Sequence, residues 1–172
     1  MNAKHFQLTS QWMIAAPIDL VWQQLSRPER WPEWWPAVLA VQTLSTGDSS
    51  GVGAIRRMHW RTALPYRLSF NMFTTRVEKH RLIEGESDGE LAGVGRWQFT
   101  REREGTRVQY DWTVNLGKPW MRIALPILRP LFTWNHNKVM EWGREGLCQR
   151  VYFGVRNISL PASLIERYSR LQ

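Results

Sequence analysis

Alternation of apolar and polar side chains runs along much of the chain and predicts an antiparallel sheet. Residues 106–114 show the pattern clearly, because Val108, Tyr110, Trp112 and Val114 alternate with polar neighbours. The same pattern predicts further strands at about 4–14, 38–44, 54–61, 66–78, 81–86 and 91–100. The apolar parity of the strand at 66–78 changes near its residues 73–75, which indicates a bulge or bend. Such strands form a sheet with one buried face and one face in water.

Apolar residues occur at helical spacing in the regions between and after these strands. Residues 17–26 begin with a proline, which suits the first position of a helix, and Asp19 then complements the helix dipole. A second, short helical or irregular segment is expected at 28–36. A long helix is expected at about 131–152, after an apolar stretch, 118–130, that prolines interrupt.

One face of the long helix should be buried. This stripe contains Phe132, Val139 and Trp142, with Gly143 and Gly146 on the same side. Glycine costs about 1 kcal/mol in a helix. Two glycines on a buried face therefore indicate that the helix approaches the curved sheet closely.

Asn135 and His136 are the polar residues on this buried stripe. Either could hydrogen-bond a ligand in a mostly apolar pocket, where it would be placed to orient a carbonyl or move a proton. The alternative is that they bond to the backbone or to each other near the start of the helix. The sequence indicates no other catalytic or metal site, since the histidines lack metal-site spacing and Cys148 lacks a basic neighbour. No metal and no cofactor is therefore expected.

Several short segments together resemble the START-like superfamily, which includes polyketide cyclases, dehydrases and the birch-pollen allergen. They are residues 16–22 (APIDLVW), 31–36 (WPEWWP), 51–53 (GVG), 95–99 (GRWQF), 105–110 (GTRVQY) and 131–136 (LFTWNH). The resemblance covers roughly residues 4–152. It implies an α+β helix-grip fold, in which a bent antiparallel sheet of six or seven strands wraps a long C-terminal helix and two short N-terminal helices close one end. The order of the expected elements supports the same fold. The helix-grip domain would be residues 1–152, followed by a C-terminal extension, 153–172.

The eleven tryptophans suggest the walls of a cavity as well as a packed core. A cavity between the sheet and the long helix should therefore bind a hydrophobic or aromatic small molecule, lipid-like or polyketide-like. The alternative is an enzyme of the polyketide cyclase or dehydrase type, which folds a reactive chain in its cavity and needs few acid–base groups. Whether the protein is an enzyme stays open. The expected ligand-binding residues are Trp60, Tyr66, Phe70, Trp97, Phe99, Tyr110, Trp112, Asn135, His136, Val139 and Trp142.

Net charge adds a second feature, an excess of basic residues. The chain of 172 residues carries a net charge of +8. From residue 117 onward it contains nine Lys or Arg but only three Glu. No basic run or nucleic-acid motif occurs, so specific nucleic-acid binding is not supported. With no long apolar span, no signal-peptide core and one cysteine, a soluble cytoplasmic protein is expected.

Residues 159–171 are expected to form a short amphipathic helix. Its apolar stripe would be Leu164, Ile165, Tyr168 and Leu171. Packing on its own domain is the favoured outcome. Contact with a second copy, or a weak contact with an anionic membrane surface, are the alternatives, and the oligomeric state stays open.

Overall fold

Seven antiparallel strands form one bent sheet in the computed structural model, which describes residues 5–89, 92–115 and 119–156. Its strands are β1 (His5–Ile14), β2 (Val38–Ser45), β3 (Ile55–Arg61), β4 (Arg67–Glu78), β5 (Leu82–Ser87), β6 (Gly93–Glu102) and β7 (Gly105–Asn115). Their order across the sheet is β1-β7-β6-β5-β4-β3-β2, so β1 pairs with the last strand and β2 forms the other edge. The expected irregularity in β4 is confirmed by a register shift between Thr74 and Arg76.

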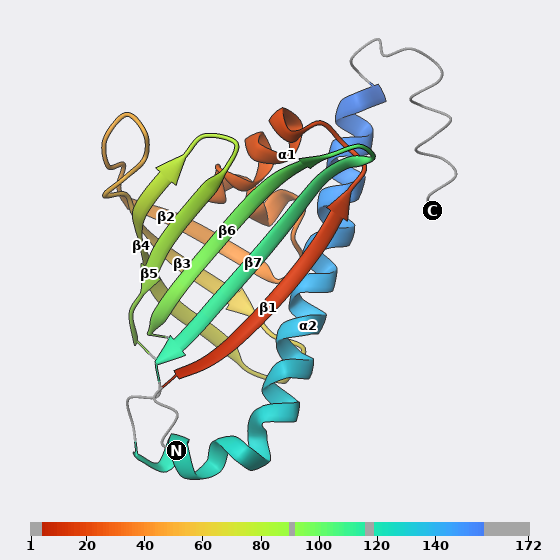
Figure 1. Ribbon diagram of the computed structural model, residues 1–172. Coiled ribbons are helices and arrows are strands. Elements are labelled where there is room, and N and C mark those ends of the chain that lie inside the picture. The colour runs from red at the N-terminus through yellow and green to blue at the C-terminus, as the bar shows by residue number, and fades with distance from the viewer. Residues whose placement is uncertain (1–4, 90–91, 116–118, 157–172) are drawn as a thin grey trace.

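Two short helices follow β1, and one long helix completes the fold. They are α1 (Ile18–Leu25), the 3-10 helix η1 (Pro28–Glu33) and α2 (Pro119–Arg156). α2 runs beside β1 along the open side of the sheet, while α1 and η1 close one end (Figure 1). This arrangement confirms the α+β helix-grip expected from the sequence.

The start of the long helix differs from the sequence prediction. α2 begins at Pro119 rather than near residue 131, and it continues to Arg156, past residue 152. The prolines at 126 and 130 lack a backbone N–H, and each removes one helical hydrogen bond. They bend the helix without ending it, and Figure 1 shows the first part of α2 crossing the bottom of the molecule before the helix turns upward.

A tryptophan segment after η1 holds α2 at close range. Trp35 is fully buried, and its indole Nε1 donates a hydrogen bond of 2.9 Å to the carbonyl oxygen of Val139. A Cβ atom at Gly143 would lie 2.4 Å from Trp35, and one at Gly146 would lie 1.7 Å from the carbonyl oxygen of Trp34. The close approach expected from the two glycines therefore exists, but their partner is this segment and not the sheet.

No helix among the described residues is both long and apolar enough to cross a membrane. The amphipathic helix expected at 159–171 lies outside the described residues. The division into residues 1–152 and 153–172, like the cytoplasmic location, stays a prediction.

Replacing Gly146 by Ala should destabilise the protein, although alanine is the better helix former. The added methyl group would collide with a backbone carbonyl, and overpacking of this kind costs about 1–3 kcal/mol. Urea unfolding should show this loss in Gly146→Ala. Gln149→Ala, at an exposed position of the same helix, should change the free energy of unfolding by less than about 0.5 kcal/mol. Equal stability of the two variants would contradict the close approach.

Candidate functional site: an aromatic cavity

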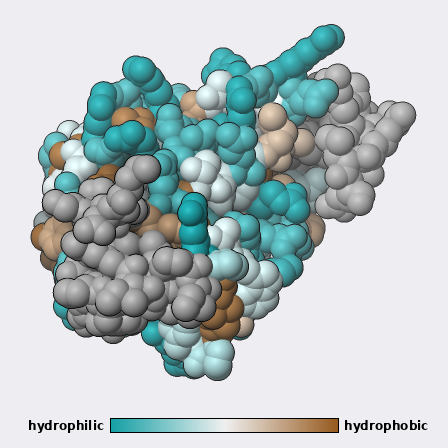
Figure 2. Space-filling model, turned by 60° about the horizontal axis from the view of Figure 1, so that its bottom comes forward, coloured by the Kyte–Doolittle hydropathy of each residue, from teal (hydrophilic) through white to brown (hydrophobic). Residues whose placement is uncertain are grey.

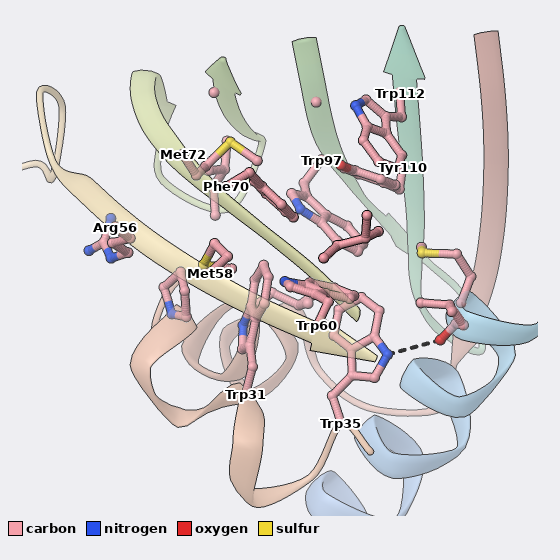
Figure 3. A pocket seen from close by; sticks show the side chains of 18 of the residues that line it. Trp31, Trp35, Arg56, Met58, Trp60, Phe70, Met72, Trp97, Tyr110 and Trp112 are labelled. Atoms are coloured by element: carbon pink, nitrogen blue, oxygen red, sulfur yellow. Dashed lines mark hydrogen bonds between the residues drawn. The ribbon is translucent and has the colours of Figure 1, made fainter. Parts of the chain in front are cut away.

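A cavity of about 430 Å³ lies between the inner face of the sheet and α2. Figure 3 shows Trp60, Trp97 and Tyr110 projecting into it from the strands, opposite Trp31 and Trp35 from the η1 segment. The aromatic part of its wall consists of Phe6, Trp22, Trp31, Trp35, Trp60, Tyr66, Phe70, Trp97, Tyr110, Trp112 and Phe132. The space is therefore shaped mainly by flat apolar side chains.

Most of the residues expected at a ligand site line this cavity. The nine that do so are Trp60, Tyr66, Phe70, Trp97, Tyr110, Trp112, Asn135, His136 and Val139. Strand alternation and the helical stripe were sufficient to place them on inward faces. Their contact with a ligand stays a prediction.

Phe99 and Trp142 were also expected in the wall, and the structure places both outside it. Phe99 shares the inner face of β6 but is covered by Trp22 of α1, with ring centroids 5.0 Å apart. Trp142 lies under the guanidinium group of Arg61, 5.4 Å from the ring centroid. Periodicity identifies the face of an element, whereas the neighbouring helix decides which part of that face remains open.

Edge-to-face contacts between tryptophans hold part of the wall in place. The ring of Trp35 meets Trp60 at 5.0 Å and 74°, and meets Trp12 at 5.7 Å and 68°. Aromatic pairs prefer this geometry because the positive edge of one ring faces the negative face of the other. The contacts join the segment after η1 to β3 and β1, so the cavity is preformed rather than created by a ligand.

The polar residues of α2 are both buried at the cavity. Asn135 and His136 are 8% and 6% exposed, and both line the space. The Asn135 side-chain oxygen accepts a hydrogen bond of 2.8 Å from the backbone N–H of Ala63. His136 Nε2 lies 3.0 Å from Ser10 Oγ. Each side chain thus has a structural partner, as one alternative expected, and also faces the cavity.

Burial sets the protonation state of the groups inside. It lowers the pKa of His136 from 6.5 to about 4, so the imidazole is neutral at pH 7. Burial also raises the pKa of Tyr110 well above its usual value of 10, so the phenol stays protonated. The Tyr110 ring stacks on Trp97 at 4.2 Å. This part of the cavity is consequently uncharged at neutral pH.

Arg56 is a cavity residue that sequence reasoning missed. Its side chain is 15% exposed, and its Nε donates a hydrogen bond of 2.6 Å to Glu29. Burial by itself raises the pKa of Glu29, but hydrogen bonds from Arg56, the backbone and Thr43, together with the Arg56 charge, lower it overall. Arg56 has the same parity on β3 as Met58 and Trp60, and this alternation was the signal that could have identified it.

No group of three or more His, Cys, Asp or Glu within the described residues could hold a metal ion. Burial raises the pKa of the Cys148 thiol, which is therefore protonated at neutral pH. The chemistry that the cavity offers is thus mainly apolar contact, with hydrogen bonding from Asn135 and Tyr110, one neutral imidazole, and charged groups that include the paired guanidinium of Arg56.

The chain belongs to the family of polyketide cyclases, dehydrases and lipid transport proteins, whose family model matches residues 5–147. The START-like resemblance expected from the sequence is thereby confirmed. A search of curated proteins finds no match.

Solved structures share the fold at low sequence identity. TTHA0849 from Thermus thermophilus has a TM-score of 0.72 and 20% identity over 87% of this chain and 99% of its own. The Zhui aromatase/cyclase from Streptomyces sp. R1128 has a TM-score of 0.62 and 17% identity, over 85% and 92%. The di-domain aromatase/cyclase StfQ of the steffimycin pathway has a TM-score of 0.64 and 17% identity, and this chain covers 52% of it against 86% of its own length. This chain therefore spans about half of that di-domain protein.

His136 should make the protein less stable as the pH falls from about 6.5 to about 4. In this window the unfolded chain binds a proton at this histidine and the folded protein does not, so stability is full above it. The shift corresponds to a loss of roughly 3 kcal/mol, complete near pH 4. Urea unfolding at a series of pH values measures this loss. The free energy of unfolding of His136→Gln should fall less than that of the wild type between pH 6.5 and pH 4. Parallel pH curves for the two proteins would contradict a buried neutral His136.

Proposed function

We propose that the protein binds a hydrophobic, aromatic or lipid-like small molecule in this cavity. The observation that carries the proposal is the preformed space of about 430 Å³ walled by aromatic rings. Pockets for small molecules usually measure about 300–1,000 Å³ and combine an apolar wall with few polar groups. The family described above supports the same class of ligand.

The polar groups narrow the chemistry of the ligand. Asn135, His136 and Tyr110 are uncharged at neutral pH, so a mostly neutral molecule suits this region. The indole N–H groups of Trp60 and Trp112, both cavity residues, are buried without a hydrogen-bond partner among the described residues. Buried donors of this kind favour a ligand with acceptor oxygens, such as carbonyl groups on an aromatic or polyketide-like skeleton.

A residue that fills the cavity should weaken binding. Leu68 lines the cavity from β4, whereas its neighbour Ser69 is exposed on the other face of the strand. Leu68→Trp should weaken the binding of oleic acid and of 1-anilinonaphthalene-8-sulfonate about tenfold or more, because the indole would occupy their space. Ser69→Trp adds the same side chain outside the cavity and should leave the Kd within about twofold. Calorimetric titration measures both.

Tryptophan emission gives an independent readout of the same event. Ligand titration should quench or shift the emission, and Trp97→Ala should lose this response while remaining folded. An unchanged Kd in a folded Leu68→Trp variant would contradict the proposal that the ligand binds in this cavity.

The second candidate is catalysis of the polyketide cyclase or dehydrase type. One observation favours it: Asn135 and His136, both uncharged at neutral pH, lie at the cavity wall, where they can hydrogen-bond and orient a carbonyl group of a bound substrate. Cyclases of this kind work mainly by folding the reactive chain in a shaped cavity. The aromatic wall described above is suited to that role.

Catalysis by these groups is tested with the double variant Asn135→Ala, His136→Ala. Turnover of a poly-β-ketone substrate should fall about 100-fold or more, because the reacting carbonyl would lose its hydrogen-bonding groups. Circular dichroism and the Kd of the anilinonaphthalene probe serve as controls for folding and cavity shape. Unchanged turnover in a folded double variant would remove both residues from the mechanism and leave binding as the function.

A further inference from the structure

We propose that one mouth of the cavity docks on the surface of an anionic lipid bilayer. The contact surface, which we call the entrance patch, consists of four exposed apolar side chains at this end of the molecule: Tyr66 and Phe132 line the cavity at its mouth, and Leu131 and Trp134 lie on the outward face of α2. It joins the loop between β3 and β4 to the lower part of α2, because the Asn135 side chain bonds to the backbone of Ala63 in that loop. This inference does not rest on the proposed ligand.

The entrance patch gathers large apolar side chains at the surface. Its four members are 39%, 42%, 37% and 47% exposed, in chain order, and they are half of the eight exposed large hydrophobic residues in the described part of the chain. Figure 2 brings this end of the molecule forward and shows brown, hydrophobic atoms reaching the surface among teal ones. Clustered apolar side chains at a surface mark an interaction site more often than single ones do.

The patch coincides with an opening of the cavity. Tyr66 and Phe132 both line the cavity and are exposed to solvent, so the cavity reaches the surface between them. A partner seated on the patch would therefore cover the mouth. Leu131 and Trp134 are outside the cavity wall and present only the outer surface.

Positive charge surrounds the patch. Arg61 and Arg67 lie directly opposite each other in the β3–β4 ladder. Two like charges in this position normally destabilise a strand pair. Arg129 lies beside the patch on α2, with its guanidinium group over the ring of Phe6. Within the described residues none of these three arginines forms a salt bridge, so an anionic partner would satisfy them.

Negative charge is absent from the segments that meet here. Residues 1–18, 54–77 and 112–140 contain no Asp or Glu. Glu86 and Asp88 lie toward the same end of the sheet but on the β5–β6 side, and Asp88 already accepts hydrogen bonds from the backbone and side chain of Asn71. The surface around the mouth is therefore basic.

The side-chain types favour a lipid surface over an acidic protein. Tryptophan and tyrosine are suited to the boundary between headgroups and hydrocarbon, and arginines beside them pair with lipid phosphates. On α2, Arg129 is available for such pairing because its side chain is exposed.

Co-sedimentation of the full-length chain with vesicles tests the proposal. We expect binding to vesicles of equal parts phosphatidylcholine and phosphatidylglycerol, little binding to phosphatidylcholine alone, and weaker binding as salt rises from about 0.05 to 0.5 M. The double variant Leu131→Ser, Trp134→Ser should bind about tenfold more weakly. The control is Phe153→Ser, which removes a side chain that is 61% exposed near the far end of the same helix.

A second pair of variants separates local charge from net charge. Arg67→Gln, Arg129→Gln should weaken vesicle binding about tenfold. Arg101→Gln, Arg103→Gln removes the same charge from exposed positions at the β6–β7 turn and should have a much smaller effect. Thermal unfolding confirms that each variant is folded, and the Kd of the anilinonaphthalene probe without vesicles should be unchanged.

Three results would overturn the proposal. The first is no binding of the wild-type chain to anionic vesicles. The second is an equal loss of vesicle binding in the patch variants and in their controls. The third is a loss of vesicle binding in the double variant Arg167→Gln, Arg170→Gln while the patch variants still bind fully. This result would assign membrane contact to the C-terminal tail.

Discussion

The hydrogen bond from the Trp35 indole to the Val139 carbonyl stands at the point where α2 is held against the rest of the molecule. Around it, Gly143 and Gly146 let the helix backbone approach the tryptophan segment to distances that any side chain would prevent. A carbonyl oxygen has two lone pairs, so the Val139 carbonyl can accept this bond and also a backbone hydrogen bond within the helix. The contact fixes α2 against this segment, and both Trp35 and Val139 line the cavity.

Two further hydrogen-bonding contacts lie one turn earlier in the same helix. Asn135 bonds to the backbone of Ala63, and His136 lies within hydrogen-bond distance of Ser10. These bonds join α2 to the β3–β4 loop and to β1. They hold the helix at both sides of the cavity without filling it, which explains how an interior rich in large aromatic side chains can still contain an open space.

Charge is distributed differently inside and outside this space. Burial keeps His136 and Tyr110 uncharged, and the charge of Arg56 is compensated by Glu29. The rim near α2 instead carries arginines without acidic partners among the described residues. An apolar molecule is therefore favoured within the cavity, while anionic surfaces are favoured at its mouth.

The sequence by itself determined the elements and their faces. Strict alternation in β6 and β7 places Trp97, Tyr110 and Trp112 inward, since side chains of a strand point to opposite faces in turn. The helical stripe likewise placed Asn135 and His136 toward the interior. These predictions succeeded because they depend on local periodicity, which the chain carries in its own residue order.

The tertiary structure decided what depends on distant neighbours. It shows that α2 passes through its prolines, that the glycines meet Trp34 and Trp35, and that α1 covers part of the β6 face. It also brings Arg56 to Glu29, which makes an inward arginine acceptable. Alternation and helical spacing can place a residue on an inward face, but they do not name its partner, because these contacts join segments that are far apart in the chain and meet only in the folded protein.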